Sequence, residues 1–289
     1  MNAFDSRGKD PLFTVVIYGL LILTLLAILI PFFYVVASSF ATEHEFMSRG
    51  FFIIPYEWTI EAYGYLLSND NFMRSFQNAV TITVTGTAIN ILLTSLMAYG
   101  LSKSWLKGRR TMNFMVLFTM IFAGGMIPTY IVVKELGLLN SYWALYLTGA
   151  IAPFNLIVMR SFFQNIPSEL EESARIDGCS EIRLFWQIVM PLSMPAVVTF
   201  TLFYAVHNWN TYFYAILFLN NMNDMPLQVF LRQMLIESDS SMEVGSGGFS
   251  YTPAVKMAAV LITAFPLLVI YPFMQKYFNK GMLMGSVKG

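Results

Sequence analysis

Stretches free of Asp, Glu, Lys and Arg recur along the chain, and six of them are long enough to cross a bilayer. A membrane-spanning helix needs about 20 mostly apolar residues. The hydrophobic pattern therefore predicts an all-α polytopic membrane protein. Its six transmembrane helices are expected at residues 12–40, 76–102, 111–133, 139–160, 190–220 and 257–276.

Two of these stretches allow a second interpretation. The first, at residues 11–42, exceeds the apolar region of a signal peptide, which has about 7–15 residues, and shows no clear cleavage site. We therefore expect it to be a retained span. The fifth, at residues 184–223, has 40 residues and could hold two spans.

The distribution of basic residues favours six spans over seven. Cytoplasmic segments of membrane proteins carry an excess of Lys and Arg. With six spans and a cytoplasmic N-terminus, 12 of the 17 basic residues lie inside, namely Arg7, Lys9, Lys103, Lys107, Arg109, Arg110, Arg160, Arg175, Arg183, Lys276, Lys280 and Lys288. Seven spans would move the basic C-terminal segment outside. The sequence thus predicts one transmembrane domain over residues 1–289, with both termini in the cytoplasm.

The composition agrees with a membrane location. Hydrophobic types make up 56% of the residues and charged types 12%, whereas soluble domains average about 25% charged. The 17 basic and 17 acidic residues balance, so no net field attracts nucleic acid. A single cysteine, Cys179, and two histidines provide neither a disulfide framework nor a multi-histidine metal site. We expect no metal and no cofactor in this chain.

The spans lack groups that would drive transport by themselves. None contains a central carboxylate, the usual mark of a proton relay, and the chain has no Gly-x-x-x-x-Gly-Lys-Ser/Thr phosphate loop. An active transporter of this kind would receive its energy through a partner surface. Sodium coupling through backbone oxygens stays open. The alternative function is an ATP-independent secondary transporter or channel for small polar solutes.

Glycine and proline interrupt several spans, at Gly124, Gly125, Pro128, Pro153, Pro191, Pro195, Pro266 and Pro272. Such residues are tolerated in membrane helices when neighbouring groups satisfy the freed backbone. Bending that gates a path and ordinary kinks in a packed bundle explain them equally well.

The loop between the fourth and fifth spans has an internal pattern of its own, at residues 168–184. Ser168 with Glu171 resembles a capping box, and Glu171 with Arg175 forms a favourable i,i+4 pair. Gly178 suits a left-handed helix end, and Ser180 can cap a second helix. The pattern predicts a helix, a glycine turn and a helix. Either a partner docks there or the segment is a solvated loop.

This loop resembles the cytoplasmic EAA motif of the permeases of bacterial ABC importers, which reads Glu-Ala-Ala-x-x-Asp-Gly and is followed by Ile-x-Leu-Pro. Residues 172–178 read Glu-Ser-Ala-Arg-Ile-Asp-Gly, and residues 188–191 read Ile-Val-Met-Pro. Ser173 and Met190 depart from the pattern by small changes in volume. Residues 125–130 and 203–210 and the tail at 275–289 are similar to the oligosaccharide branch, the maltose-permease-like proteins.

The resemblance implies a type I ABC importer permease fold in a bacterial plasma membrane. It also implies a second homologous permease chain, two cytoplasmic ABC ATPases that bind the ATP, an extracytoplasmic solute-binding protein and a sugar substrate. The residues at the motif positions, and those of the tail that would contact the ATPases, are Glu172, Ser173, Ala174, Asp177, Gly178, Lys288 and Gly289.

A polar cluster in the fifth span is the candidate substrate path, formed by Tyr204, His207, Asn208, Trp209, Asn210 and Tyr212. On one continuous helix, Tyr204, His207, Asn208 and Thr211 share a face. Polar groups in mid-membrane are costly unless they are paired or face a wet path. The cluster therefore lines the path or forms hydrogen bonds between helices.

Overall fold

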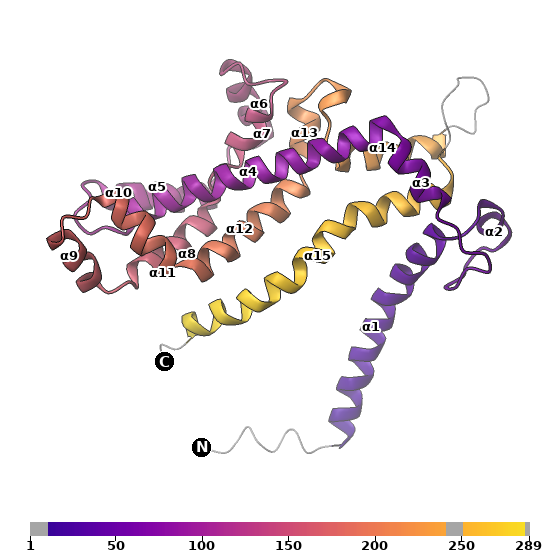
Figure 1. Ribbon diagram of the computed structural model, residues 1–289, viewed down its shortest axis with the longest axis horizontal. Helices are drawn as coiled ribbons and strands as arrows, with labels where there is room; N and C mark the ends of the chain where they lie inside the picture. Colours follow the sequence, from indigo (N-terminus) through magenta and orange to yellow (C-terminus); the bar gives the residue numbers. More distant parts are fainter. Residues whose placement is uncertain (1–10, 241–250, 287–289) are drawn as a thin grey trace. The chain divides into compact units, whose positions relative to one another are not determined.

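The computed structural model describes residues 11–240 and 251–286 (Figure 1). These residues form helices and connecting loops, together with an isolated antiparallel bridge between Ala41 and Trp58. The chain divides into two compact units, Met1–Asp70 with Gln233–Ala264 and Asn71–Arg232 with Phe265–Gly289. The all-α fold expected from the hydrophobic pattern is confirmed for the described residues.

The first unit contains helices from both ends of the chain. They are α1 (Pro11–Ser39), α2 (Glu43–Ser48), α3 (Glu61–Ser68) and parts of α14 (Leu227–Ser240) and α15 (Pro253–Ser286). α1 is apolar on every side, and most of its large side chains from Leu12 to Phe33 are exposed. A helix that is hydrophobic all round needs lipid or protein to cover it. α1 therefore fits the first expected span.

The segment after α1 folds back on the end of that helix. The amide of Thr59 donates to the carbonyl of Phe40 at 2.8 Å. The hydroxyls of Ser39 and Tyr63 lie 2.7 Å apart. These bonds hold the start of α3 against the end of α1.

Glu45 organises the loop between α2 and α3. Its buried carboxylate accepts hydrogen bonds from the amide of Tyr56 at 2.9 Å and from the guanidinium of Arg49 at 2.5 Å. Burial by itself would raise the pKa of Glu45, but the hydrogen bonds from Tyr56, Arg49 and Glu57 outweigh burial and lower it. The loop is thus stabilised by the ionised form of Glu45.

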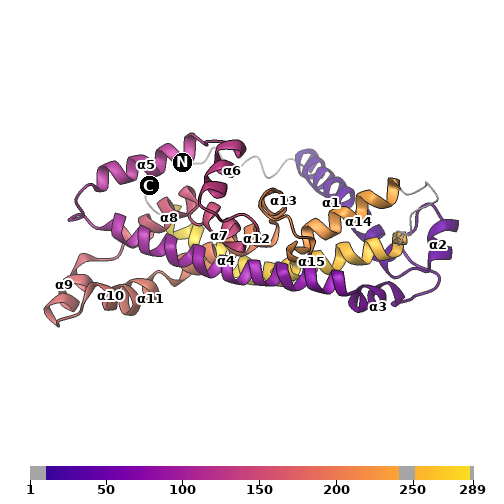
Figure 2. The same ribbon diagram turned by 90° about the horizontal axis from the view of Figure 1, so that it is seen from above.

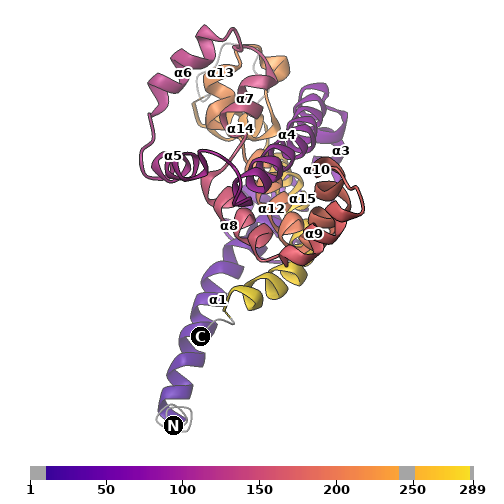
Figure 3. The ribbon, with the colours of Figure 1, turned by 90° about the vertical axis from the view of Figure 1, so that its left-hand side faces the viewer.

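The second unit is built around α4 (Asp70–Ser102). Its other elements are α5 (Arg109–Ile121), α6 (Met126–Glu135), α7 (Tyr142–Thr148), α8 (Pro153–Gln164), α9 (Ser168–Ile176), α10 (Glu181–Leu184), the π-helical turn η2 (Phe185–Val189), α11 (Met190–Leu192), α12 (Met194–Trp209), α13 (Phe213–Phe218), the 3₁₀ turn η3 (Met222–Asp224) and the remaining parts of α14 and α15. α9, α10 and α11 lie beside the C-terminal end of α4 (Figures 1 and 2). α6, α7 and α13 gather together, away from α9 (Figure 3).

The helices agree in part with the expected spans. Three helices of the described residues are long and apolar enough to cross a membrane, or five if each of two bent pairs is one span. α7 and α8 form one bent pair, at 57°, and Glu181–Leu192 with α12 forms the other, at 85°. The total of six spans and the cytoplasmic location of both termini stay predictions.

Three expected spans are not continuous helices. Over 139–160, residues 149–152 separate α7 from α8. Over 111–133, residues 122–125 separate α5 from α6, and Gly125 adopts a φ of 87° that leaves the helix. Over 190–220, α12 ends at Trp209 and α13 begins at Phe213. The side-chain amide of Asn210 donates to the backbone carbonyl of Val206 at 2.8 Å, and such side-chain bonds to the backbone compete with helix continuation. The break before Met126 contains the helix breakers Gly124 and Gly125 noted in the sequence, whereas no glycine or proline marks the break after Trp209.

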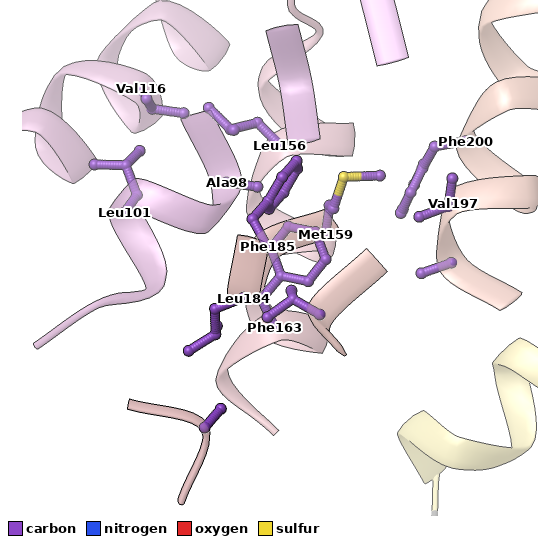
Figure 4. Close-up of a cluster of buried hydrophobic side chains, with 13 residues drawn as sticks. Ala98, Leu101, Val116, Leu156, Met159, Phe163, Leu184, Phe185, Val197 and Phe200 are labelled. Carbon is purple, nitrogen blue, oxygen red and sulfur yellow. The ribbon is translucent and has the colours of Figure 1, made fainter. Parts of the chain in front are cut away.

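A cluster of buried apolar side chains joins α4, α8 and the segment after α9 (Figure 4). Ala98 of α4, Met159 and Phe163 of α8, Leu184 of α10 and Phe185 belong to it, and each is at most 2% exposed. Close-packed interiors transmit displacements because they have little free volume. The cluster therefore connects α10 firmly to α4 and α8.

Candidate functional site

The segment after α8 forms the helix, glycine turn and helix expected from its sequence. α9 ends at Ile176, Gly178 has a φ of 77°, and the hydroxyl of Ser180 caps α10 by accepting from the amide of Arg183 at 3.4 Å. Glycine adopts this left-handed conformation without the strain that a Cβ would add. A Cβ on Gly178 would meet no heavy atom within 4 Å, so the turn is open to another molecule.

The expected capping box at the start of α9 was wrong. The residue before the helix is Pro167, which provides no side-chain cap, and Ser168 is already the first helical residue. The carboxylate of Glu171 points instead to Lys103, at 2.5 Å. A charge-assisted hydrogen bond is stronger than the neutral bonds of a cap, which explains this choice.

The outward surface of the segment carries most of the EAA residues. Three polar motif residues are exposed, namely Glu172, Ser173 and Asp177. Ile176 is 86% exposed and Ile182 is 74% exposed. Ala174 faces the other way and packs in the buried cluster. Large apolar side chains exposed beside charges are typical of an interaction surface.

Exposed charged side chains on the same segment connect α9 and α10. Arg175 donates from Nε to the Glu181 carboxylate at 2.9 Å, and its Nη2 lies 3.4 Å from the Glu171 carboxylate. The hydrogen bond with Glu181 raises the pKa of Arg175. The i,i+4 pair of Glu171 and Arg175 expected from the sequence is confirmed.

Two residues of the candidate substrate path are buried and bonded to other helices. The hydroxyl of Tyr204 lies 2.7 Å from that of Thr94 and accepts from the amide of Ala152 at 3.0 Å. The amide nitrogen of Asn208 donates to the Asn90 carbonyl oxygen at 2.8 Å. Tyr204 and Asn208 therefore hold α12 to α4 and to the break between α7 and α8.

The other path residues lie differently. His207 and Asn210 are exposed, whereas Trp209 is buried and its carbonyl accepts from the side chain of Gln228 at 3.1 Å. Tyr212 lies beyond the end of α12, with the guanidinium carbon of Arg232 4.7 Å from its ring centroid. The cluster is not one helical face, and the expectation that Thr211 shares a face with it was wrong because α12 ends first.

Sequence reasoning missed four residues of these sites, the first of which is Thr94, the partner of Tyr204. Asn90 and Thr87 in α4 bond to Asn208, at 2.8 and 3.2 Å, and Lys103 pairs with Glu171. A lone amide within an apolar span is a signal that could have identified Asn90. Nothing in the sequence distinguishes Lys103 from the other basic residues that were assigned to the cytoplasmic side. The tail residues Lys288 and Gly289 lie outside the described residues.

Comparisons with known proteins agree with the EAA resemblance. Residues 6–284 match the family model described as "Binding-protein-dependent transport system inner membrane component". The polygalacturonan/rhamnogalacturonan transport system permease protein YtcP of Bacillus subtilis (strain 168) is 51% identical over 97% of this chain and 100% of its own length. Protein LplC of the same organism is 52% identical over 90% of both chains.

A solved structure agrees as well. It is the crystal structure of a bacterial ABC transporter involved in the import of the acidic polysaccharide alginate. The matched chain has a TM-score of 0.85 and 32% identity, with 95% of this chain and 99% of that chain covered. The chain is thus a member of the binding-protein-dependent transport system inner membrane component family.

Proposed function

We propose that the chain is one of two permease subunits of an ATP-driven importer for acidic oligosaccharides in a bacterial plasma membrane. Its relatives include a permease of polygalacturonan and rhamnogalacturonan transport and a transporter for alginate. These polymers share sugar carboxylates, which supports an acidic substrate. The partners are a second permease, two cytoplasmic ABC ATPases and an extracytoplasmic binding protein.

The exposed helix–glycine–helix surface of α9 and α10 carries this proposal. It offers Glu172 for a basic partner group, and two exposed isoleucines, Ile176 and Ile182, for an apolar cleft. Gly178 lets a second backbone approach closely. ATP-driven closure of the ATPases then moves α9 and α10 as a rigid body and alternates access to the path.

Docking is tested by purifying the tagged chain from its host in mild detergent, with Gly178→Asp beside the parent. Gly108→Asp is a matched control, since Gly108 has a φ of 78° and equally open surroundings. We expect ATPases and a second permease to co-purify with the parent and the control, and the ATPases to be lost from Gly178→Asp. A chain that purifies alone and still moves solute into vesicles would instead be a secondary transporter or channel.

The substrate class is tested by competition. Uptake of labelled oligogalacturonides by cells that express the importer should be reduced by unlabelled acidic oligosaccharides and unaffected by neutral ones of equal length. Equal competition by the neutral series would contradict an acidic substrate and leave the importer function intact.

For the path itself, the exposed side chains of His207 and Asn210 are the candidates for contact with the sugar, and Tyr212 beside Arg232 is a third. A sugar binds aromatic faces and paired hydrogen-bonding groups, and a guanidinium matches a carboxylate. Tyr204 and Asn208 have protein partners and hold the surrounding helices. Trp209 supports them from within the bundle.

A further inference from the structure

Lys103 and Glu171 form a buried ion pair between two segments that are far apart in the sequence. Lys103 directly follows α4, Glu171 lies in α9, and Nζ and Oε1 are 2.5 Å apart. The two residues are 6% and 9% exposed. Breaking a buried pair leaves an uncompensated charge away from water, which is strongly unfavourable. The end of α4 and α9 are therefore held together.

A second connection runs parallel to this pair. The hydroxyl of Tyr99 in α4 donates to the Glu181 carboxylate at 2.7 Å, and Glu181 accepts from Arg175 of α9. The ammonium of Lys103 lies 4.2 Å from the ring centroid of Tyr99. Together these residues form a closed ring of charged and aromatic groups from α4 through α9 and α10 and back to α4.

The ion pair lies where apolar packing is interrupted. An open cleft of about 360 Å³ lies between the start of α9 and the loop after α4, and its lining includes Lys103, Phe163, Ser168, Glu171 and Arg175. Atoms across a cleft forfeit their van der Waals contacts and cannot push on one another. Ala174, further along α9, belongs to the buried apolar cluster, so it is a displacement of the first turn of α9 that reaches α4 through the charged groups.

α4 in turn contacts the region around the candidate path. The side-chain amide nitrogen of Asn90 donates to the backbone carbonyl of Gly149, at the break between α7 and α8, at 3.0 Å. Its carbonyl oxygen accepts from Asn208 of α12. A movement of α4 along or about its axis thus acts on two helix ends at once.

We propose that Lys103 and Glu171 are positioning residues that transmit the displacement of α9 to α4, and so couple ATP hydrolysis to opening of the path. This inference rests on the proposed function, in which partner ATPases move α9. Neither residue contacts the substrate or ATP. Removal of either charge uncouples hydrolysis from transport.

The test uses the complete importer in proteoliposomes, with both permeases, the ATPases and the binding protein. Lys103→Met and Glu171→Gln each remove one charge at nearly constant volume. Lys107→Met removes a charge at an exposed position of the same loop and is the control. Uptake of a panel of labelled neutral and acidic oligosaccharides is measured together with ATP hydrolysis.

We expect both pair variants to lower the solute moved per ATP by about tenfold, since couplings between sites usually amount to factors of about 5–150. Lys107→Met should leave the ratio unchanged. If a single variant fails to assemble, the double variant Lys103→Met/Glu171→Leu is measured in its place. Removing both charges avoids an unpaired buried ion. A proportional fall of hydrolysis and uptake, or an unchanged ratio, would overturn the inference.

A covalent rescue separates transmission of movement from folding. In a Cys179→Ala background, Lys103→Cys and Glu171→Cys are joined by a short bifunctional thiol reagent that a reductant removes. The joined importer should regain coupling and lose it again on reduction; failure to regain it contradicts the inference. If the importer takes up only neutral oligosaccharides, the proposal of an acidic substrate is refuted. The solute moved per ATP would then be measured with the neutral oligosaccharides. No uptake by the parent importer would refute the proposed function and this inference with it.

Discussion

Replacement of Asn208 by alanine tests whether this residue is a structural bond between helices or a contact for the substrate. Its amide nitrogen donates to Asn90 at 2.8 Å and to Thr87 at 3.2 Å, and the residue is 8% exposed. Asn208→Ala removes both bonds and leaves the buried carbonyl oxygen of Asn90 without this donor. An exposed neighbour, His207, provides the matched comparison on the same helix.

The expected loss follows from these two bonds. Hydrogen bonds between membrane helices contribute about 0.6 kcal/mol on average and at most about 1.7 kcal/mol. Two of them, together with an acceptor that loses its partner, give a destabilisation of about 1–3 kcal/mol. His207→Ala removes no buried partner and should change the free energy of unfolding by less than about 0.5 kcal/mol.

The assay is unfolding of the purified importer in mild detergent by increasing fractions of a denaturing detergent, followed by tryptophan fluorescence. Asn208→Ala should unfold at a lower fraction than the parent, and His207→Ala should unfold with the parent but take up less sugar. The reasoning is refuted if Asn208→Ala keeps the parent's stability and loses uptake, because Asn208 would then act on the substrate.

Three further substitutions follow from the geometry. A Cβ on Gly86 would lie 3.0 Å from the side-chain amide nitrogen of Asn208, so Gly86→Ala should lower the free energy of unfolding by about 1–3 kcal/mol in the same assay. The control is Gly100→Ala on the same helix, whose Cβ would meet no atom within 4 Å and which should be neutral or stabilising. Equal effects of the two substitutions would contradict the packing argument. Hydrogen bonds lower the pKa of Glu45 below its usual range despite its burial, so the ionised carboxylate stabilises the loop after α2 above the usual glutamate pKa, and this is lost as the pH falls through the lowered value. Glu45→Gln should remove this acid dependence, measured by limited proteolysis of the loop over a pH series. An unchanged pH profile would contradict it. Ser180→Ala removes the side-chain cap of α10 and should destabilise that helix by about 0.5–2 kcal/mol. The loss should be measurable as faster hydrogen exchange of the backbone amides of α10. Exchange at the rate of the parent would mean that the cap is dispensable.

The motif at residues 172–178 was readable from the sequence because its information is local. A helix end, a glycine with positive φ and a serine cap depend on neighbours within a few residues, and the structure confirms Gly178 and Ser180 in those roles. The same reasoning erred at Ser168. A distant charge, Lys103, competed for Glu171, and no local pattern announces such a partner.

The hydrophobic pattern along the chain predicted an all-α membrane protein and the approximate positions of its long helices. About 20 successive apolar residues are long enough to cross the bilayer as a helix. The pattern did not determine where those helices break. The break between α5 and α6 depends on the extended backbone at Phe122 and on the positive φ at Gly125. At the end of α12, the side chain of Asn210 bonds to the carbonyl of Val206. The helices that pack against α12 determine which of its polar side chains are buried: Tyr204 and Asn208 are, and His207 is not. Burial is a property of non-local contacts, so only the tertiary structure could separate the residues that hold the bundle from those open to a substrate.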